Sequence, residues 1–339
     1  MMRKKFFDFV IGNPPYQEDT NGAGRQAKPV YNIFMDEVKK LDPKSISLIT
    51  PSRWFSGGMG LDRFRNEMLN CHHLKSIVDF TNAKDIFPNT SVSGGVNYFV
   101  WQKEYYGDCE FTNITNGKKT VKTRDLSEFP ILVRYNQAVD IIRKVKSKSE
   151  DSLDTITSGL MPFGLSTSYR GREKKTVKDS LTLYASNCIT YISPKEITNG
   201  KEYVGKYKVL ISKTGAEHAG EPSRDGCFRV IPSSMKVIGP GEVCTHSYFL
   251  IGQFEDKRLA ENVYKYMSTK FVRLLMLMAM SGFTLSKIVM AFVPLQNFTP
   301  DSDIDWSQSI HDIDLQLYKK YGLDENEIKF IETNVKEMA

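Results

Sequence analysis

Short apolar runs alternate with helical patterns over residues 6–104, and this alternation restricts the possible folds more than any other feature of the chain. Four runs have the length and the β-branched or aromatic content of strands, at 6–11, 45–50, 74–80 and 96–102. Between them, residues 31–41 and 61–69 carry apolar side chains at helical spacing. The β-α-β-α order predicts an α/β fold with a largely parallel, Rossmann-like sheet covered by helices.

The pattern changes after residue 106, so the 339 residues are expected to form two main domains, the first over 1–106. Residues 107–150 are polar and lysine-rich, which is typical of a connector. Residues 151–300 combine short β-like runs with one long helical pattern over 256–280 and predict an α+β domain. Residues 301–339 predict a helical tail whose last helix opens with a capping box.

Charge is divided unevenly along the chain, which has a net charge of +6. Residues 1–300 hold 42 basic and 30 acidic residues, whereas residues 301–339 hold 4 and 10. A basic body attracts polyanions, although its charge alone does not identify one. The acidic tail is interpreted as a solvated helical cap.

The five cysteines form no closely spaced pair, which favours a reduced, cytoplasmic setting. The spacing of Cys227, Cys244 and His246 matches no zinc pattern, so no metal site is expected. The apolar run 271–283 is too short to cross a bilayer and contains Arg273. No membrane role is therefore expected.

A sharp polar turn, Asn13-Pro14-Pro15-Tyr16, directly follows Gly12 and the first predicted strand. Open α/β sheets bind ligands at this position, beyond the carboxyl end of a strand. The prolines hold Asn13 extended, so that its side-chain oxygen and the Pro14 carbonyl form a preorganised pair of acceptors. Tyr16 adds a flat face on which an extruded base can stack. Asn and Pro are also common in ordinary turns, but the preceding strand and Gly12 favour a binding site.

The turn and several later segments together resemble the N6-adenine DNA methyltransferases of type II restriction-modification systems, particularly those with a target-recognition domain after the catalytic one. In the catalytic part the resemblance continues through residues 48–55, 86–89 and 93–101. In the second part it covers residues 248–298 and 317–323. It implies a partial methyltransferase sheet followed by an α+β target-recognition domain.

The resemblance implies duplex DNA as partner, with adenine flipped into a catalytic site formed by the Asn-Pro-Pro-Tyr turn. Asn13 and Pro14 would accept both hydrogens of the adenine amino group, which favours a pyramidal nitrogen with a localised lone pair. Tyr16 and Phe87 would stack on the flipped base, with plain core packing as the alternative for Phe87. No general base is required, because the methylated nitrogen loses its proton readily.

Several basic residues are candidate contacts to DNA phosphates. Those of the first domain follow the turn, in a segment that is equally compatible with a solvated loop. Those of the second domain lie in two segments, 169–175 and 213–224. The candidates are Arg25, Lys28, Arg170, Arg172, Lys174, Lys175, Lys213 and Arg224.

One part of the family pattern has no counterpart in this sequence. Members of the family bind S-adenosylmethionine with a Gly-rich turn and an acidic residue placed before the Asn-Pro-Pro-Tyr turn, whereas twelve residues precede Asn13 here. The glycine clusters at 22–24, 57–60 and 239–241 do not form the required G-x-G-x-x-G turn between a strand and a helix. The resemblance thus implies S-adenosylmethionine as cofactor, at a site not visible in this chain.

Two functions are compatible with these observations. The chain is expected to be part of a split or truncated adenine methyltransferase, active with a companion chain that supplies the S-adenosylmethionine motif. The alternative is a DNA-recognition subunit, or a remnant, without catalysis.

Overall fold

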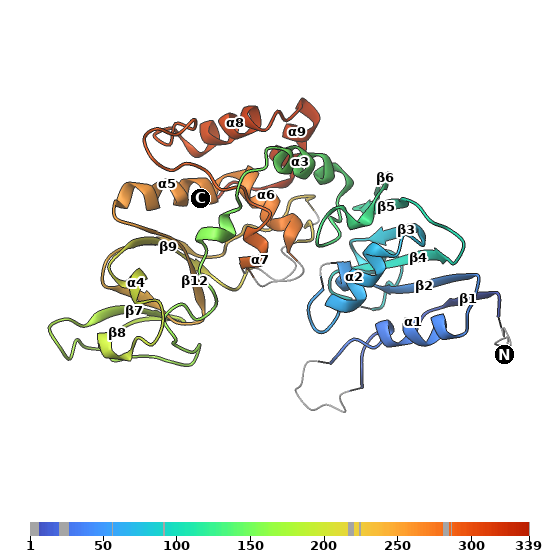
Figure 1. Cartoon of the computed structure of the whole chain (residues 1–339), viewed down its shortest axis with the longest axis horizontal. Helices are drawn as coiled ribbons and strands as arrows, with labels where there is room; N and C mark the ends of the chain where they lie inside the picture. Colours follow the sequence, from blue (N-terminus) through green and yellow to red (C-terminus); the bar gives the residue numbers. More distant parts are fainter. Residues whose placement is uncertain are drawn as a thin grey trace. The chain divides into compact units, whose positions relative to one another are not determined.

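The computed structural model describes residues 7–19, 27–55, 57–90, 92–215, 220–223, 225–280, 285 and 287–338 (Figure 1). The chain forms two compact units. The first comprises Met1–Val139 together with Gly220–Gly226, and the second comprises Asp140–Ala219 together with Cys227–Ala339. A short segment from the second half of the sequence therefore belongs to the first unit.

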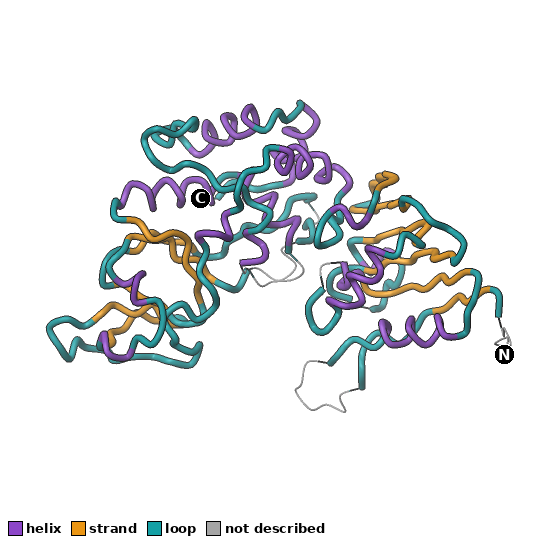
Figure 2. The backbone as a smooth tube through the Cα atoms, in the orientation of Figure 1, coloured by secondary structure: helices purple, strands orange, loops and turns teal. Residues whose placement is uncertain are grey.

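The first unit is built on a six-stranded sheet with the order β1-β2-β4-β3-β5-β6 (Figure 2). Each strand and helix predicted over residues 6–104 is present. The strands are β1 (Phe9–Gly12), β2 (Ser45–Pro51), β3 (Leu74–Phe80), β4 (Val96–Gln102), β5 (Cys109–Thr115) and β6 (Lys118–Arg124). The helices are α1 (Tyr31–Lys40), α2 (Asp62–Asn70) and the single turns η1 (Ser52–Phe55), η2 (Ala83–Asp85) and η3 (Leu126–Glu128). Helix α3 (Asn136–Ser147) begins in this unit and continues into the second.

The sheet is mixed, which corrects the expectation of a largely parallel one. β1 pairs with β2, and β3 with β5, in parallel. β4 is antiparallel to both of its neighbours, and β6 is antiparallel to β5. The described residues between β3 and β4 contain only the single turn η2 and no crossover helix, so β4 returns beside β3 in the opposite direction.

Helices α1 and α2 pack on the same face of this sheet. Their side chains, including Met35 and Phe64, join Leu48 and Phe99 in one hydrophobic core. On the opposite face, Phe9, Ile11 and Tyr98 are 69%, 84% and 40% exposed. Around β1, β2 and β4, the described residues therefore cover only one face of the sheet. The sequence pattern predicts helices on both faces.

Residues 107–150, which the sequence predicts as a connector, form regular secondary structure instead. β5 and β6 form a hairpin that extends the sheet, and the first unit continues to Val139. β6 is an edge strand and exposes Lys118 and Lys119. Charged side chains protect an edge strand from pairing with other chains, and the same composition is typical of a linker.

The second unit is an α+β structure with two three-stranded sheets, β10-β9-β12 and β11-β7-β8. β9 is antiparallel to both neighbours, whereas β7 is parallel to β11 and antiparallel to β8. The strands are β7 (Leu181–Ala185), β8 (Cys188–Ile192), β9 (Tyr207–Ser212), β10 (Met235–Ile238), β11 (Glu242–Cys244) and β12 (Tyr248–Phe254). The helices are η4 (Leu153–Ile156), η5 (Pro194–Glu196), α4 (Lys201–Val204), α5 (Lys257–Ser268), α6 (Lys270–Ala279), α7 (Lys287–Met290), α8 (Ile310–Lys320) and α9 (Glu325–Asn334).

The pattern predicted as one helix over 256–280 forms the two helices α5 and α6. Thr269 between them is extended, and its side chain accepts a hydrogen bond from the Val272 amide at 3.3 Å. Thr is a favoured N-cap residue, and this local signal interrupts a continuous apolar periodicity. The predicted capping box is confirmed at α9, where the Glu327 amide donates to Asp324 and the Asp324 amide donates to Glu327.

Two features are absent from the described part of the chain. No helix in it is long and apolar enough to cross a membrane. No group of three or more His, Cys, Asp or Glu side chains is placed to hold a metal ion.

Candidate active site

The Asn-Pro-Pro-Tyr turn begins where β1 ends, at the edge of the sheet where the parallel strand β2 also ends. Pro14 is buried, Tyr16 is half-buried and Asn13 is exposed. Among the described residues, the Asn13 side chain makes no hydrogen bond. Among the described residues, no partner therefore occupies its amide oxygen, which is open to a ligand.

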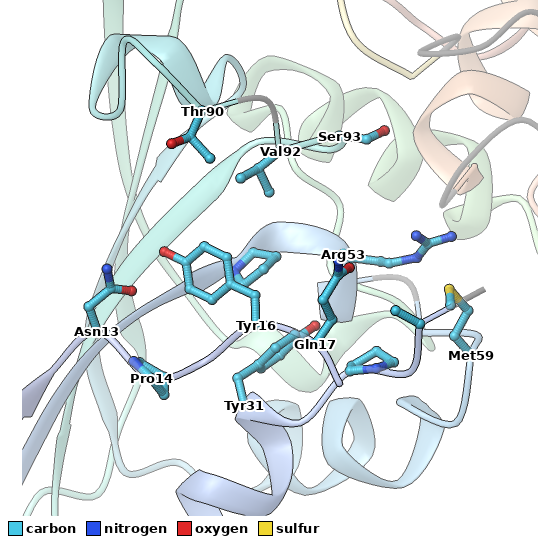
Figure 3. A pocket seen from close by; sticks show the side chains of 13 residues that line it. Asn13, Pro14, Tyr16, Gln17, Tyr31, Arg53, Met59, Thr90, Val92 and Ser93 are labelled. Carbon is cyan, nitrogen blue, oxygen red and sulfur yellow. The ribbon is translucent and has the colours of Figure 1, made fainter. Parts of the chain in front are cut away.

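The turn forms one wall of a cavity of about 570 Å³. Figure 3 shows Asn13, Pro14 and Tyr16 on one side of the cavity, with the segment that bears Thr90 and Ser93 on the other. The other residues that line the cavity are Gln17, Ala27, Pro29, Tyr31, Pro51, Arg53, Met59 and Val92. The volume is within the range of small-molecule sites and can accommodate a nucleotide.

Two tyrosine hydroxyls at the cavity are buried without a hydrogen-bond partner among the described residues, those of Tyr16 and Tyr31. Burial raises the pKa of both phenols, so both are neutral. Tyr31 is fixed by an edge-to-face contact with Phe64, with ring centroids 6.0 Å apart. An unsatisfied buried hydroxyl is costly in a folded protein and is compatible with a ligand that completes its hydrogen bonding.

Arg53 also lines the cavity and was not singled out from the sequence. It lies in η1, directly after β2, and its guanidinium makes no hydrogen bond to another described residue. β1 and β2 are parallel neighbours, so their carboxyl ends meet at one edge of the sheet. That rule would have placed Arg53 beside the turn, had the pairing of these two strands been considered.

Phe87 is not among the residues that line the cavity, although the resemblance gives it a stacking role. Its amide donates to the Ala83 carbonyl at 2.8 Å, and the ring is half-buried. Thr90, Val92 and Ser93, which follow in the sequence, line the cavity instead. Contact between Phe87 and a bound base stays a proposal.

The loop that bears Ser93 is held from two sides. The Gly94 amide donates to the carboxylate of Glu221 at 2.6 Å, and the Tyr135 hydroxyl donates to the Gly220 carbonyl at 2.9 Å. Gly95 has φ +74°, and a Cβ there would lie 2.1 Å from the Phe80 carbonyl oxygen. The segment 220–223 thus helps to fix the cavity wall opposite Asn13.

A buried ion pair supports the segment that follows β2. Asp79, fully buried at the end of β3, accepts hydrogen bonds from Arg134 at 2.6 and 2.8 Å. It also accepts from Ser52 at 2.7 Å and from Asn113 at 2.9 Å. Because Ser52 opens η1, this network ties the segment that carries Arg53 to the sheet.

Among the candidate DNA contacts of the first unit, Lys28 is exposed, and its carbonyl accepts from the Glu18 amide at 2.9 Å. Arg25 and Arg224 lie outside the described residues. Lys28 therefore flanks the turn without lining the cavity.

The candidate DNA contacts of the second unit differ in how many of them already have partners within the protein. Arg172 pairs with Glu196 at 2.6 Å, a contact that lowers the pKa of that carboxyl to about 2. Arg170 donates to the Thr167 carbonyl at 2.6 Å, and the Lys175 ammonium lies 5.5 Å from the Tyr191 ring centroid. Lys174 is exposed and makes no hydrogen bond within the described chain. Lys213 lines a separate cavity.

Part of the chain is similar in sequence to known methylases. Residues 1–87 match the Eco57I restriction-modification methylase family. An uncharacterized adenine-specific methylase of Mycoplasma pneumoniae (strain ATCC 29342 / M129 / Subtype 1) is 37% identical over 105 residues, 30% of this chain and 25% of that protein. The chain thus spans about a quarter of the length of that relative.

Two solved restriction-modification structures are also similar. The type IIL enzyme MmeI, in complex with DNA, has a TM-score of 0.48 at 8% identity, over 95% of this chain and 56% of that chain. The type IIG restriction endonuclease BpuSI has a TM-score of 0.36 at 12% identity, over 91% of this chain and 48% of that chain.

Methylases of this kind imply S-adenosylmethionine, but the described residues do not fit it. No carboxylate lines the cavity to bind the ribose hydroxyls. The glycine cluster at 57–60 is closed by its own helix, because the Gly58 amide donates to Asp62 at 3.3 Å and Arg65 pairs with the same carboxylate at 3.1 Å. The described residues that line this cavity, and the glycine cluster beside it, therefore offer no site for the cofactor.

Proposed function

We propose that this chain is the base-binding and DNA-reading part of a DNA adenine-N6 methyltransferase of a restriction-modification system. One observation carries the proposal: the free Asn13 amide, the Tyr16 ring and the Arg53 cation line a single cavity at the carboxyl ends of two parallel strands. The match of residues 1–87 to the methylase family and the adenine-specific methylase relative support it.

The chemistry assigned to the turn concerns the adenine amino group. Its lone pair is delocalised into the ring, which makes the nitrogen a poor nucleophile. Acceptance of one hydrogen by the Asn13 side chain and of the other by the Pro14 carbonyl favours a pyramidal nitrogen with a localised lone pair. The prolines fix this pair before the base arrives, so that little reorganisation is needed during the reaction.

Arg53 supplies the charge that a flipped nucleotide requires. The base carries its sugar and flanking phosphates to the mouth of the cavity, and a guanidinium can bind a phosphate with two parallel hydrogen bonds. No acidic residue among those lining the cavity opposes it. We therefore assign Arg53 to the backbone of the flipped nucleotide, and Asn13 and Tyr16 to its base.

The open face beside β1 supports a companion chain. β1 is an edge strand, and the adjacent Phe9 and Ile11 are exposed on the face opposite α1 and α2. Large apolar side chains on a sheet face are normally covered by helices or by further strands. A companion that adds strands beside β1 and packs helices on this face would cover them and would bring the S-adenosylmethionine turn to the edge where Asn13 lies.

The second unit is proposed as the target-recognition domain, which reads the intact duplex while the first unit holds the extruded base. Its α+β structure and its basic segment 169–175 are compatible with this role. Because Arg172 is paired with Glu196, DNA binding through Arg172 would require exchange of that partner. Arg170 and Lys174 are the stronger candidates for phosphate contacts.

Reconstitution tests the proposed function. The chain mixed with a companion that carries the Gly-rich turn should transfer a methyl group to duplex DNA and bind S-adenosylmethionine in calorimetry, whereas the chain alone should bind none measurably. Ile11→Lys places a charge on the open face and should prevent assembly with the companion. Val121→Lys, on the opposite edge strand β6 and 51% exposed, is the matched control and should leave assembly intact.

Other results would change the proposal. Saturable S-adenosylmethionine binding by the chain alone would contradict the proposal that a companion chain supplies the cofactor site. Specific DNA binding by the assembled complex without any methyl transfer would favour the recognition subunit without catalysis.

The role of Tyr16 can be isolated by two substitutions. Tyr16→Ala should weaken retention of the flipped base by about 5- to 150-fold, since base stacking is worth about 1 to 3 kcal/mol. Tyr16→Phe keeps the ring that stacks on the base and removes only the hydroxyl, which has no described partner in the free protein, so it should retain the base better than Tyr16→Ala. Fluorescence of 2-aminopurine at the target position reports base retention. Equal loss in both variants would show that the hydroxyl, and not the ring, holds the base.

A further inference from the structure

A second cavity, of about 430 Å³, lies within the second unit where several loops meet. It is lined by the β7–β8 turn, the end of β9 and the segment before β12; the residues are Thr167, Ser186, Asn187, Ser212, Lys213, Thr214, His246, Ser247 and Tyr248. Backbone hydrogen bonds hold the loops together. The Lys213 amide donates to the Ser247 carbonyl and the His246 amide to the Leu165 carbonyl, both at 2.9 Å. The cavity is therefore preformed.

Three side chains in this cavity form a chain of hydrogen bonds. The Lys213 ammonium lies 3.2 Å from Nε2 of His246, and Nδ1 of His246 lies 3.1 Å from the Thr167 hydroxyl. An ammonium can only donate, so Nε2 must accept and the imidazole proton must be on Nδ1. Burial, and then the Lys213 charge, lower the pKa of His246 and keep the ring neutral. His246 thus fixes the direction of the ammonium and leaves two of its hydrogens free.

The rest of the lining suits an anion. Lys213 is the basic residue of the lining, and none of the other lining residues is acidic. The Ser247 hydroxyl is buried without a partner among the described residues, so it can donate to a ligand. A partly buried cation with nearby hydroxyl donors and no opposing carboxylate matches the charge and the acceptors of a phosphate group.

We propose that this cavity binds one phosphate of the DNA backbone, with Lys213 as the cation and His246 as the residue that positions it. The DNA source of the phosphate rests on the proposed function of the second unit. A phosphate held in a preformed cavity carries no sequence information but fixes the position of the duplex against the protein. The site would therefore set the register in which the second unit reads its target.

A titration of the full chain with inorganic phosphate tests the chemistry of the cavity, followed through the imidazole resonances of His246 by NMR. The His246→Gln variant assigns those resonances. Saturable shifts are expected in the parent protein and in Lys329→Met, an exposed lysine of α9 that serves as the charge control. Lys213→Met should lose them. Absence of saturable shifts in the parent protein would overturn the anion site.

Duplex DNA tests the source of the phosphate. The affinity is measured at several salt concentrations, and the slope of log affinity against log salt concentration is compared between variants. For Lys213→Met this slope should be shallower than in the parent protein by about 0.9, the value for one phosphate contact. Lys329→Met should keep the parent slope. His246→Leu should weaken DNA binding, because the Lys213 ammonium loses its acceptor. His246→Gln retains an acceptor and should bind DNA like the parent protein.

The outcomes separate the two proposals. If the parent protein binds phosphate but no duplex DNA, the proposed function fails while the anion site stands. If DNA binds and Lys213→Met leaves the salt slope unchanged, the cavity does not contact the backbone and the present inference is wrong. Thermal melting of each variant shows whether a loss reflects the site or the fold.

Discussion

Asn13→Ala is expected to lower the rate of methyl transfer by about 10²- to 10³-fold in the reconstituted enzyme, the effect of removing one preorganised polar group that acts in the transition state. The Asn13 side chain makes no hydrogen bond to another described residue and is exposed, so the folded protein should lose little stability. Duplex affinity should be nearly unchanged, because the amide acts on the flipped base rather than on the intact helix.

Single-turnover rates with saturating DNA measure this effect, and filter binding measures the affinity. Gln17→Ala is the control, since Gln17 lines the same cavity without contributing to the proposed acceptor pair. Normal turnover of Asn13→Ala would show that the turn is a structural element, and the catalytic assignment would have to be withdrawn.

Asp79→Ala should destabilise the first unit by about 3–5 kcal/mol, the range for removing one partner of a buried ion pair. Asp79 is fully buried, and its loss leaves the Arg134 guanidinium without its carboxylate and Ser52 and Asn113 without their acceptor. Urea unfolding of the full chain, followed by a signal from the first unit, measures the change.

Asp36→Ala is the matched comparison for Asp79. Asp36 pairs with Arg63 at 3.2 Å on the surface of the same unit, with the two side chains 36% and 75% exposed. Exposed ion pairs contribute about 0–1 kcal/mol, so this variant should unfold close to the parent protein. Similar losses for both variants would mean that the Asp79 network is not the support described above.

Much of the first unit could be predicted from local patterns. The runs at 74–80 and 96–102 coincide with β3 and β4, because short runs rich in β-branched and aromatic residues favour strands. The turn at Asn13 was also predictable, since two prolines after a strand leave few alternative conformations. These features depend on neighbours in the chain.

The features that were missed depend on contacts between distant residues. The direction of β4 follows from strand pairing, and the hairpin β5–β6 carries a composition that also fits a linker. Arg53 reaches the cavity because β1 and β2 are parallel, and His246 meets Lys213 across 33 positions of sequence. No local pattern records such pairings.

The segment Gly220–Gly226 has a consequence for how such proteins could be recombined. It lies between two stretches of the second unit in sequence, yet it belongs to the first unit and fixes the loop at Gly94 through Glu221. The second unit can therefore not be exchanged for that of a relative as one uninterrupted cassette. A chimera made at a single junction near Val139 would place a foreign segment against the loop that forms the cavity wall. The second unit could be exchanged cleanly only as two cassettes, one on each side of this insert.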